Sequence, residues 1–184
     1  MTHFSLIPFP DNCPHPEIEI TGQIEQFNQQ LSITFLLTGE IEKIAIAPAD
    51  PNPSRQNELW QTTCFEFFLG LKDSPKYWEF NLSPAGHWNI YRFDDYREGM
   101  AEELAFQSLP FLVKIKPDSL TLSLSLDLET IISSTQALEV GITTVIQSNI
   151  NDLISEQNSI TYWALTHVSK EADFHQRKSF ILDL

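Results

Sequence analysis

The sequence is short of basic side chains, and this shortage excludes classes of partner. Its 184 residues contain 11 Lys and Arg against 25 Asp and Glu, which gives a formal net charge of −14 at neutral pH. Because nucleic-acid binding rests on clustered Lys and Arg, this balance argues against a nucleic-acid partner. It also argues against attachment to an anionic membrane surface. The charge itself does not identify a partner.

Cysteines and long apolar runs are also scarce. Cys13 and Cys64 are the only cysteines. They could form a disulfide, but two free thiols in a reducing compartment are the favoured interpretation. The N-terminal residues lack the basic and apolar regions of a secretory signal, and no run is long enough to span a bilayer. We therefore expect a cytoplasmic protein.

The common catalytic and cofactor-binding motifs are missing as well. The sequence contains no CxxC, HExxH, GxSxG, P-loop or Rossmann glycine pattern. Cys64 could pair with His87 or His175 as nucleophile and base. A cysteine between aromatic residues in the middle of a strand is, however, typical of a core position.

Two groups of carboxylates suggest chemistry, each beside a simpler interpretation. Glu66 and Glu79 could serve glycoside hydrolysis, which needs two carboxyl groups about 5–10 Å apart. A strand face can also carry such a pair by chance. Asp94, Asp95 and Glu98 could bind a hard cation such as calcium through oxygen ligands. A solvated acidic turn would have the same composition. We otherwise expect no cofactor.

Short alternating runs separated by turn residues fill most of the chain. Hydrophobic residues make up 42% and aromatic residues 11% of the sequence, which predicts a folded protein and, at this length, one domain over residues 1–184. The pattern predicts an all-β fold: an antiparallel, jelly-roll-like β-sandwich of about ten strands with little helix. The predicted strands are 17–27, 31–37, 42–47, 63–69, 77–82, 87–93, 111–116, 120–126, 138–147 and 160–166, with 180–184 closing the chain.

The remaining segments are expected to be less regular. Four prolines in residues 1–16 predict irregular structure there. Gly22 suggests a bulge within the first predicted strand. The other expectations are a helical turn or long loop at 97–109, a short helix at 127–132 capped by Asp127, and a polar loop at 148–158.

The three central strands, 63–69, 77–82 and 87–93, are expected to form an antiparallel meander because the turns between them are short. Side chains alternate across a strand, so parity assigns each residue to a face. One face is apolar. The other combines carboxylates, amides and aromatic rings, and its members are Cys64, Glu66, Phe68, Tyr77, Glu79, Asn81, His87, Asn89, Tyr91 and Phe93.

This mixed face has two interpretations. It could be the half-solvated side of an antiparallel sheet. It could instead be a ligand-binding face, and Glu66 favours this because a charge between Phe65 and Phe67 is costly without partners. We expect Glu66 to be largely buried and held by Arg, amide or backbone donors.

The order of several aromatic motifs resembles a known family. Leu59-Trp60, with Glu66-Phe67 after five intervening residues, precedes a Pro-Gly turn and an aromatic strand. Near the end come Tyr162-Trp163, then 172–175 with the sequence Ala-Asp-Phe-His, and finally Phe180. From residue 17 to the end, this arrangement is similar to DOMON-like domains related to family 9 carbohydrate-binding modules. The resemblance implies a β-sandwich that holds a sugar end between two aromatic rings.

The resemblance also implies roles for individual residues. Trp60 matches the first stacking ring and Glu66 the hydroxyl-binding carboxylate. Phe174 stands where the second ring would be tryptophan, and Arg92 could supply a guanidinium. The full set of expected ligand-binding residues is Trp60, Glu66, Glu79, Asn81, Tyr91, Arg92, Phe174 and His175.

Alternatives to sugar binding remain open. Another DOMON branch binds haem b through Met and His, but Met100 is the only internal methionine and the sequence pairs no His with it. Haem is therefore not expected. The rivals to non-catalytic binding of a sugar or similar small polar ligand are a glycoside hydrolase using Glu66 and a structural or protein-interaction domain. Trp60 itself could be a stacking platform or a plug at the end of the sandwich. The sequence does not indicate an oligomeric state.

Overall fold

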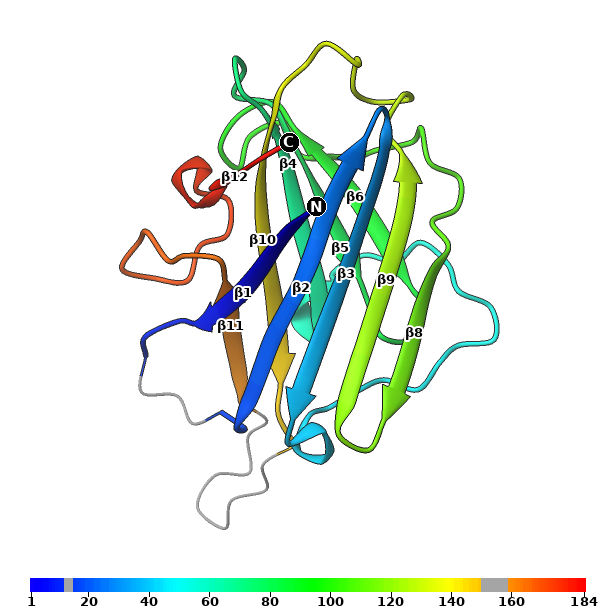
Figure 1. Ribbon diagram of the computed structural model, residues 1–184, viewed down its shortest axis with the longest axis vertical. Coiled ribbons are helices and arrows are strands. Elements are labelled where there is room, and N and C mark those ends of the chain that lie inside the picture. The colour runs from blue at the N-terminus through cyan, green and yellow to red at the C-terminus, as the bar shows by residue number, and fades with distance from the viewer. Residues whose placement is uncertain (12–14, 150–158) are drawn as a thin grey trace.

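A computed structural model describes residues 1–11, 15–149 and 159–184. Its strands form two antiparallel layers, seen one in front of the other in Figure 1. Strand makes up 50% of the structure and helix 5%. The predicted β-sandwich is confirmed, with twelve strands in place of about ten. Within the described residues, no helix has the length and apolar character needed to cross a membrane.

The front layer in Figure 1 pairs strands from both halves of the chain. Its order is β2, β3, β9 and β8, and each neighbouring pair is antiparallel. The strong period-two alternation of Leu with Ser and Thr in β9 places its leucines toward the other layer. The bounds are β2 Ile18–Phe27, β3 Gln30–Gly39, β8 Phe111–Lys116 and β9 Ser119–Asp127.

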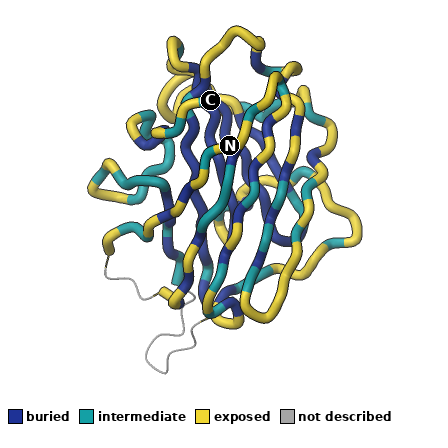
Figure 2. Tube along the Cα trace, viewed as in Figure 1, coloured by how far each residue is buried: buried dark blue, intermediate teal, exposed yellow. Residues whose placement is uncertain are grey.

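The rear layer contains the aromatic meander. Its order is β7, β6, β5, β4, β10 and β11, and β12 pairs with the N-terminal end of β10. Both β4 and β5 are buried along their whole length, as the dark strands of Figure 2 show. The bounds are β4 Cys64–Leu71, β5 Tyr77–Leu82, β6 Trp88–Phe93, β7 Ala101–Glu102, β10 Leu138–Gln147, β11 Ile160–Ala164 and β12 Leu182–Asp183.

The N-terminal segment joins the layers: residues 2–8 form a strand, which corrects the prediction of irregular structure for the first part of residues 1–16, whereas 9–11 and 15–16 are irregular and 12–14 lie outside the described residues. Strand β1 (Thr2–Pro8) pairs with β2 through its first five residues and with β11 through Ile7 and Pro8. The prolines lie at or after the end of the strand, where no further ladder donor is needed. Residues 2–7 therefore keep all their backbone N–H groups for strand pairing, and β1 closes one side of the sandwich between β2 and β11.

Other local predictions were also wrong. Residues 42–47 form no strand: a short 3-10 turn, Ile41–Lys43, precedes a single bridge from Ile44 to Ser148. At residues 127–132, Asp127 Oδ1 accepts the backbone N–H of Glu129 across a turn. The predicted helix over residues 127–132 is absent, and a turn stands in its place. Of the predicted polar loop 148–158, residues 150–158 lie outside the described residues.

The sandwich core is built from the inward faces of both layers. Phe35 on β3 meets Phe65 on β4 edge to face, with ring centroids 5.2 Å apart. Phe67 and Phe80 stack at 4.3 Å on neighbouring strands of the rear layer. These contacts confirm the predicted apolar face of the meander and leave Glu66, between Phe65 and Phe67, on the opposite face.

Candidate functional site

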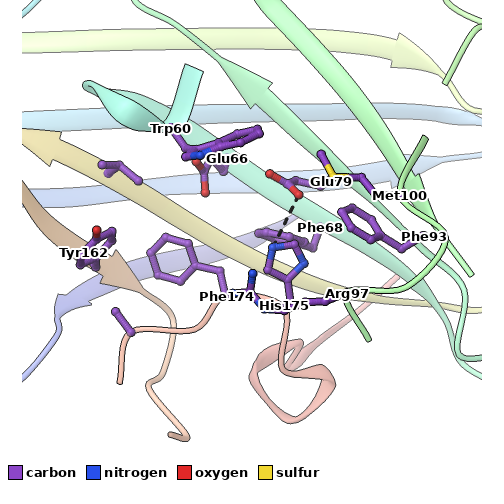
Figure 3. A pocket seen from close by; sticks show the side chains of 12 residues that line it. Trp60, Glu66, Phe68, Glu79, Phe93, Arg97, Met100, Tyr162, Phe174 and His175 are labelled. Carbon is purple, nitrogen blue, oxygen red and sulfur yellow. Dashed lines mark ion pairs between the residues drawn. The ribbon is translucent and has the colours of Figure 1, made fainter. Parts of the chain in front are cut away.

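The outer face of the rear layer is covered, so it is not the half-solvated face that its polar residues could suggest. The segment after β11 folds back over it, and Phe180 packs on Phe68 and Tyr77. A cavity of about 380 Å³ remains between this segment and the sheet (Figure 3). Its lining is Trp60, Glu66, Phe68, Glu79, Phe93, Arg97, Met100, Val145, Tyr162, Ala172, Phe174 and His175.

Trp60 reaches the cavity from a turn just before β4. The 3-10 turn Leu59–Gln61 follows Glu58, which adopts a left-handed backbone conformation with φ of 60°. Leu59 is buried and anchors the turn, whereas Trp60 is half-buried. Its indole packs edge to face on Tyr91, with ring centroids 5.7 Å apart. This partial exposure leaves Trp60 open to a ligand.

Tyr91 and Asn81 were expected to bind ligand, but the structure places both behind the lining. The Tyr91 hydroxyl donates to Asn57 Oδ1 at 2.9 Å and accepts from Asn89 Nδ2 at 2.9 Å, which fixes the ring beneath Trp60. Asn81 is fully buried and donates from Nδ2 to Glu79 Oε1 at 2.8 Å. Both residues therefore support the side chains that line the cavity.

Glu66 and Glu79 both reach the cavity from neighbouring strands. Glu66 is only 2% exposed, which confirms its predicted burial. Its expected Arg, amide or backbone donors are absent from the described structure: the Thr143 hydroxyl donates to Oε2 at 3.0 Å, and Oε1 has no hydrogen-bond partner. The Cys64 thiol lies close enough to act as a weak hydrogen-bond donor that lowers the pKa of Glu66, but by geometry its acceptors are Asn81 Oδ1 at 3.8 Å and the Phe65 carbonyl oxygen at 3.9 Å.

Burial changes the protonation of both carboxyl groups. Desolvation, together with the neighbouring charge of Glu79, raises the pKa of Glu66 to about 8. Desolvation also raises the pKa of Glu79 to about 7, against the opposing effects of the Asn81 hydrogen bond and the Arg97 charge. The two groups therefore take up a proton far more readily than ordinary surface carboxylates.

His175 is a neutral member of the site. Burial and the charge of Arg97 lower the pKa of its imidazole to about 4. Its Nδ1 lies 2.9 Å from the Tyr77 hydroxyl, and its Nε2 lies 3.8 Å from Glu79 Oε2, the contact dashed in Figure 3. With a neutral imidazole this last contact is no salt bridge at neutral pH.

Arg97, and not Arg92, places a guanidinium on the cavity lining. Arg92 lies exposed on the opposite face of β6 and does not line the cavity. Arg97 follows β6 in a tight turn, where a left-handed backbone with φ of 52° directs its amide to the Tyr77 hydroxyl at 3.2 Å. Its side chain donates to Asp173 Oδ1 at 2.9 Å.

Phe174 and His175 enter because Asp173 fixes their loop. Asp173 accepts hydrogen bonds from Arg97, the Tyr96 hydroxyl at 2.6 Å, the His175 amide at 3.1 Å and Gln176 Nε2 at 2.9 Å. These bonds lower the pKa of Asp173 to about 2, against the opposing effect of its burial. Residues 172–175 thus fold back toward Trp60, and Phe174, His175 and Trp60 line the same cavity.

Five of the eight ligand-binding residues predicted from the sequence line the cavity: Trp60, Glu66, Glu79, Phe174 and His175. The lining residues absent from that candidate set are Phe68, Phe93, Arg97, Met100, Val145, Tyr162 and Ala172. The sequence could have identified Phe68 and Phe93, because strand alternation places them on the same face as Glu66 and Tyr91. Arg97 could not be identified in this way, because it lies in a turn whose backbone geometry the sequence does not specify.

The donor set does not fit the cofactors considered. Met100 and His175 both line the cavity, but each His175 ring nitrogen already faces a partner on β5, so the pair does not fit the two axial ligands of a haem. Within the described residues, no three His, Cys, Asp or Glu side chains gather as a metal site. Cys64 is a free, buried thiol whose pKa burial raises; Cys13 lies outside the described residues.

Known proteins resemble this chain in structure. No family model matches the sequence, and no curated protein matches it at a significant level. A solved structure of a proposed carbohydrate-binding protein from Bacteroides uniformis ATCC 8492 is similar, with a TM-score of 0.65 and 13% identity, over 98% of this chain and 84% of that chain. The two chains share a fold.

More remote similarities come from a carbohydrate binding module family 9 of Caldicellulosiruptor kristjanssonii. Its complexes with glucose and cellotriose have TM-scores of 0.44 and 0.43 and identities of 10% and 11%. Each covers 82% of this chain, and 68% and 67% of the respective module chains. These similarities are too weak to support an inference about the site.

Proposed function

We propose that the protein binds a carbohydrate, or a similar small polar ligand, without catalysis in the cavity between Trp60 and Phe174. The observation that carries the proposal is an aromatic-walled cavity containing a buried, unpartnered carboxyl oxygen, Glu66 Oε1. A pyranose has apolar faces that pack on aromatic rings and hydroxyls that hydrogen-bond to polar groups. The cavity offers both kinds of contact.

The size of the cavity suits one sugar unit. Ligand pockets range over about 300–1,000 Å³, and this cavity, at about 380 Å³, lies near the lower limit. In Figure 3 the Trp60 and Phe174 rings lie on opposite sides of the two carboxyl groups. The proposed carbohydrate binding of the B. uniformis protein agrees with this function.

The carboxyl environments favour binding over glycoside hydrolysis. A hydrolase needs one protonated and one ionised carboxyl group, and such enzymes provide environments that separate the two pKa values. Here burial raises the pKa of both Glu66 and Glu79, and neither has a cationic partner that would hold it ionised among the described residues. The pair is built for hydrogen bonding more than for acid–base chemistry.

A glycan array followed by calorimetry tests the proposal. We expect saturable binding of at least one sugar, strong loss of binding in Trp60→Ala, and retention in Arg92→Ala, because Arg92 lies outside the cavity. A sugar-release assay on the same glycans should detect no product. Product formation would establish the hydrolase instead, and absence of binding to every glycan would favour a structural or interaction domain.

A further inference from the structure

The cavity contains two carboxyl groups that no cationic side chain of the described residues contacts directly. Arg97 is the cation on its lining, but its guanidinium is already paired with Asp173 at 2.9 Å. Glu79 accepts a hydrogen bond from the neutral Asn81 amide at 2.8 Å and lies 3.8 Å from the neutral His175. Glu66 forms no ion pair within the described residues. A ligand therefore meets two carboxyl groups without a protein counter-charge.

Glu66 is also incompletely hydrogen-bonded. The Thr143 hydroxyl satisfies Oε2, while Oε1 is buried and receives no hydrogen bond from the residues that the structure describes. A buried polar atom without a partner costs about 1–3 kcal/mol, and native proteins pair nearly all such atoms. This oxygen belongs to a residue that lines a cavity, so a donor on a bound ligand would remove the cost.

Aromatic rings enclose the same space. Five of the lining side chains are aromatic: Trp60, Phe68, Phe93, Tyr162 and Phe174. The faces of such rings attract cations, and aromatic enclosures are a recurrent means of binding ammonium groups. Two carboxyl groups without a directly paired cation, inside an aromatic enclosure, thus favour a positively charged ligand over a neutral one.

We propose that the ligand is an amino sugar whose ammonium group donates hydrogen bonds to Glu66 and Glu79. This inference rests on the proposed function, because it selects one class among carbohydrates. An ammonium carries three donors and a full positive charge, so it can bond to both groups at once and stabilise their ionised forms. A single hydroxyl at that position supplies one donor and no such stabilisation. The ring of the sugar packs between Trp60 and Phe174.

Calorimetry with matched sugars tests the inference. The probes are glucose with glucosamine, galactose with galactosamine, and mannose with mannosamine, with N-acetylglucosamine as an uncharged control. We expect one amine to bind at least about tenfold more tightly than its neutral partner, as hydrogen bonds to charged groups allow. Equal affinity within every pair would overturn the inference and leave the proposed function intact. No binding by any probe or glycan would overturn both.

Variants show whether the two carboxyl groups cause the preference. Glu66→Gln and Glu79→Gln keep the side-chain shape but cannot become charged, so each should reduce the ratio of amine to neutral-sugar affinity toward one. Arg92→Gln, outside the cavity, should keep the parent ratio. An unchanged ratio in both carboxyl variants, each confirmed as folded by its melting transition, would contradict the assignment.

Discussion

At the scale of single residues, Glu66 shows what the sequence could and could not predict. Its two phenylalanine neighbours indicated burial, and the side chain is only 2% exposed. Its real donor, Thr143, lies 77 residues further along the chain and meets Glu66 because β10 pairs with β4 in this register. Local sequence specifies the cost of burying the carboxyl group, whereas strand pairing specifies its partner.

The raised carboxyl pKa values predict a loss of stability as the pH rises. A carboxyl whose pKa is higher in the folded than in the unfolded state binds its proton more tightly when folded, so its stabilising effect is lost above the unfolded value. Burial lowers the pKa of His175 to about 4, so this imidazole binds its proton less tightly in the folded than in the unfolded state. Its titration therefore reduces the free energy of unfolding only as the pH falls below about 6.5, the pKa of an unfolded histidine. Between about pH 6.5 and 8 the carboxyl pair dominates.

We therefore expect the free energy of unfolding to fall by roughly 1–3 kcal/mol between pH 6.5 and 8. Glu66→Gln should remove at least half of this fall, because glutamine cannot ionise. Denaturant unfolding at several pH values measures it, with Arg92→Gln as the control. The same slope in parent and Glu66→Gln would show that the Glu66 carboxyl is not the source.

The stability of a Trp60 variant shows whether this side chain is an exposed stacking platform or a plug that fills the end of the sandwich. It is half-buried and rests on Tyr91, whereas Trp88, on the same meander, is 4% exposed in the core. Trp60→Ala should cost about 1–2 kcal/mol, near the value of one aromatic contact and an ordinary substitution. Trp88→Ala should cost about 3–5 kcal/mol because it leaves a core cavity. Equal losses in thermal unfolding would identify Trp60 as a plug.

At the scale of elements, the loop carrying Phe174 depends on Asp173. Two of its four accepted hydrogen bonds, from Tyr96 and Arg97, join the loop to the turn after β6, and the other two come from His175 and Gln176 within the loop. The sequence placed Phe174 and His175 near Trp60 only through a family resemblance, because no local pattern links residues 173 and 97. Such a contact is decided by the path of an irregular segment over the sheet.

Asp173→Ala should loosen this loop selectively. We expect amides of residues 172–176 to exchange with solvent at least about tenfold faster, since local opening depends on few contacts. Sugar affinity should fall with it. Asp94→Ala is a matched control, because Asp94 is exposed and its ion pair with Lys76 spans 3.9 Å. Unchanged exchange in Asp173→Ala would show that other contacts hold the loop.

Gly22 in β2 is needed for close packing and not for the bulge that we predicted from the sequence. Pairing continues through Gly22 on both sides, to Phe4 and to Phe35, so the expected bulge is absent from this strand. A Cβ at Gly22 would come within 2.1 Å of the Thr34 carbonyl oxygen and 2.3 Å of the Phe4 ring. Glycine is required here because Phe4 of β1 covers it.

Gly22→Ala should therefore destabilise the protein by about 1–3 kcal/mol, as overpacked positions do. The effect should appear as a lower denaturant midpoint with an unchanged slope. Thr21→Ala, at the adjacent β2 position, should cost less than half as much. A parent-like midpoint for Gly22→Ala would show that β1 can move away without penalty.

At the scale of the whole molecule, alternation predicted the sandwich well. Residues 138–147, for example, are strand β10 with the predicted bounds, because a long β-branched run has no competing structure. The predictions failed where tertiary context decides: β1 pairs despite its prolines, and residues 42–47 remain nearly unpaired. The site, assembled from six elements and two loops, depends on that context throughout.

The most direct measurement follows the indole N–H signals of the four tryptophans by NMR during titration with a sugar that binds. Trp60 is the tryptophan on the cavity lining, and the Trp60→Phe spectrum assigns its signal. We expect the Trp60 signal to move in proportion to saturation, while those of Trp78, Trp88 and Trp163, buried elsewhere, stay nearly fixed. Saturable sugar binding that leaves the Trp60 signal in place would contradict binding in this cavity.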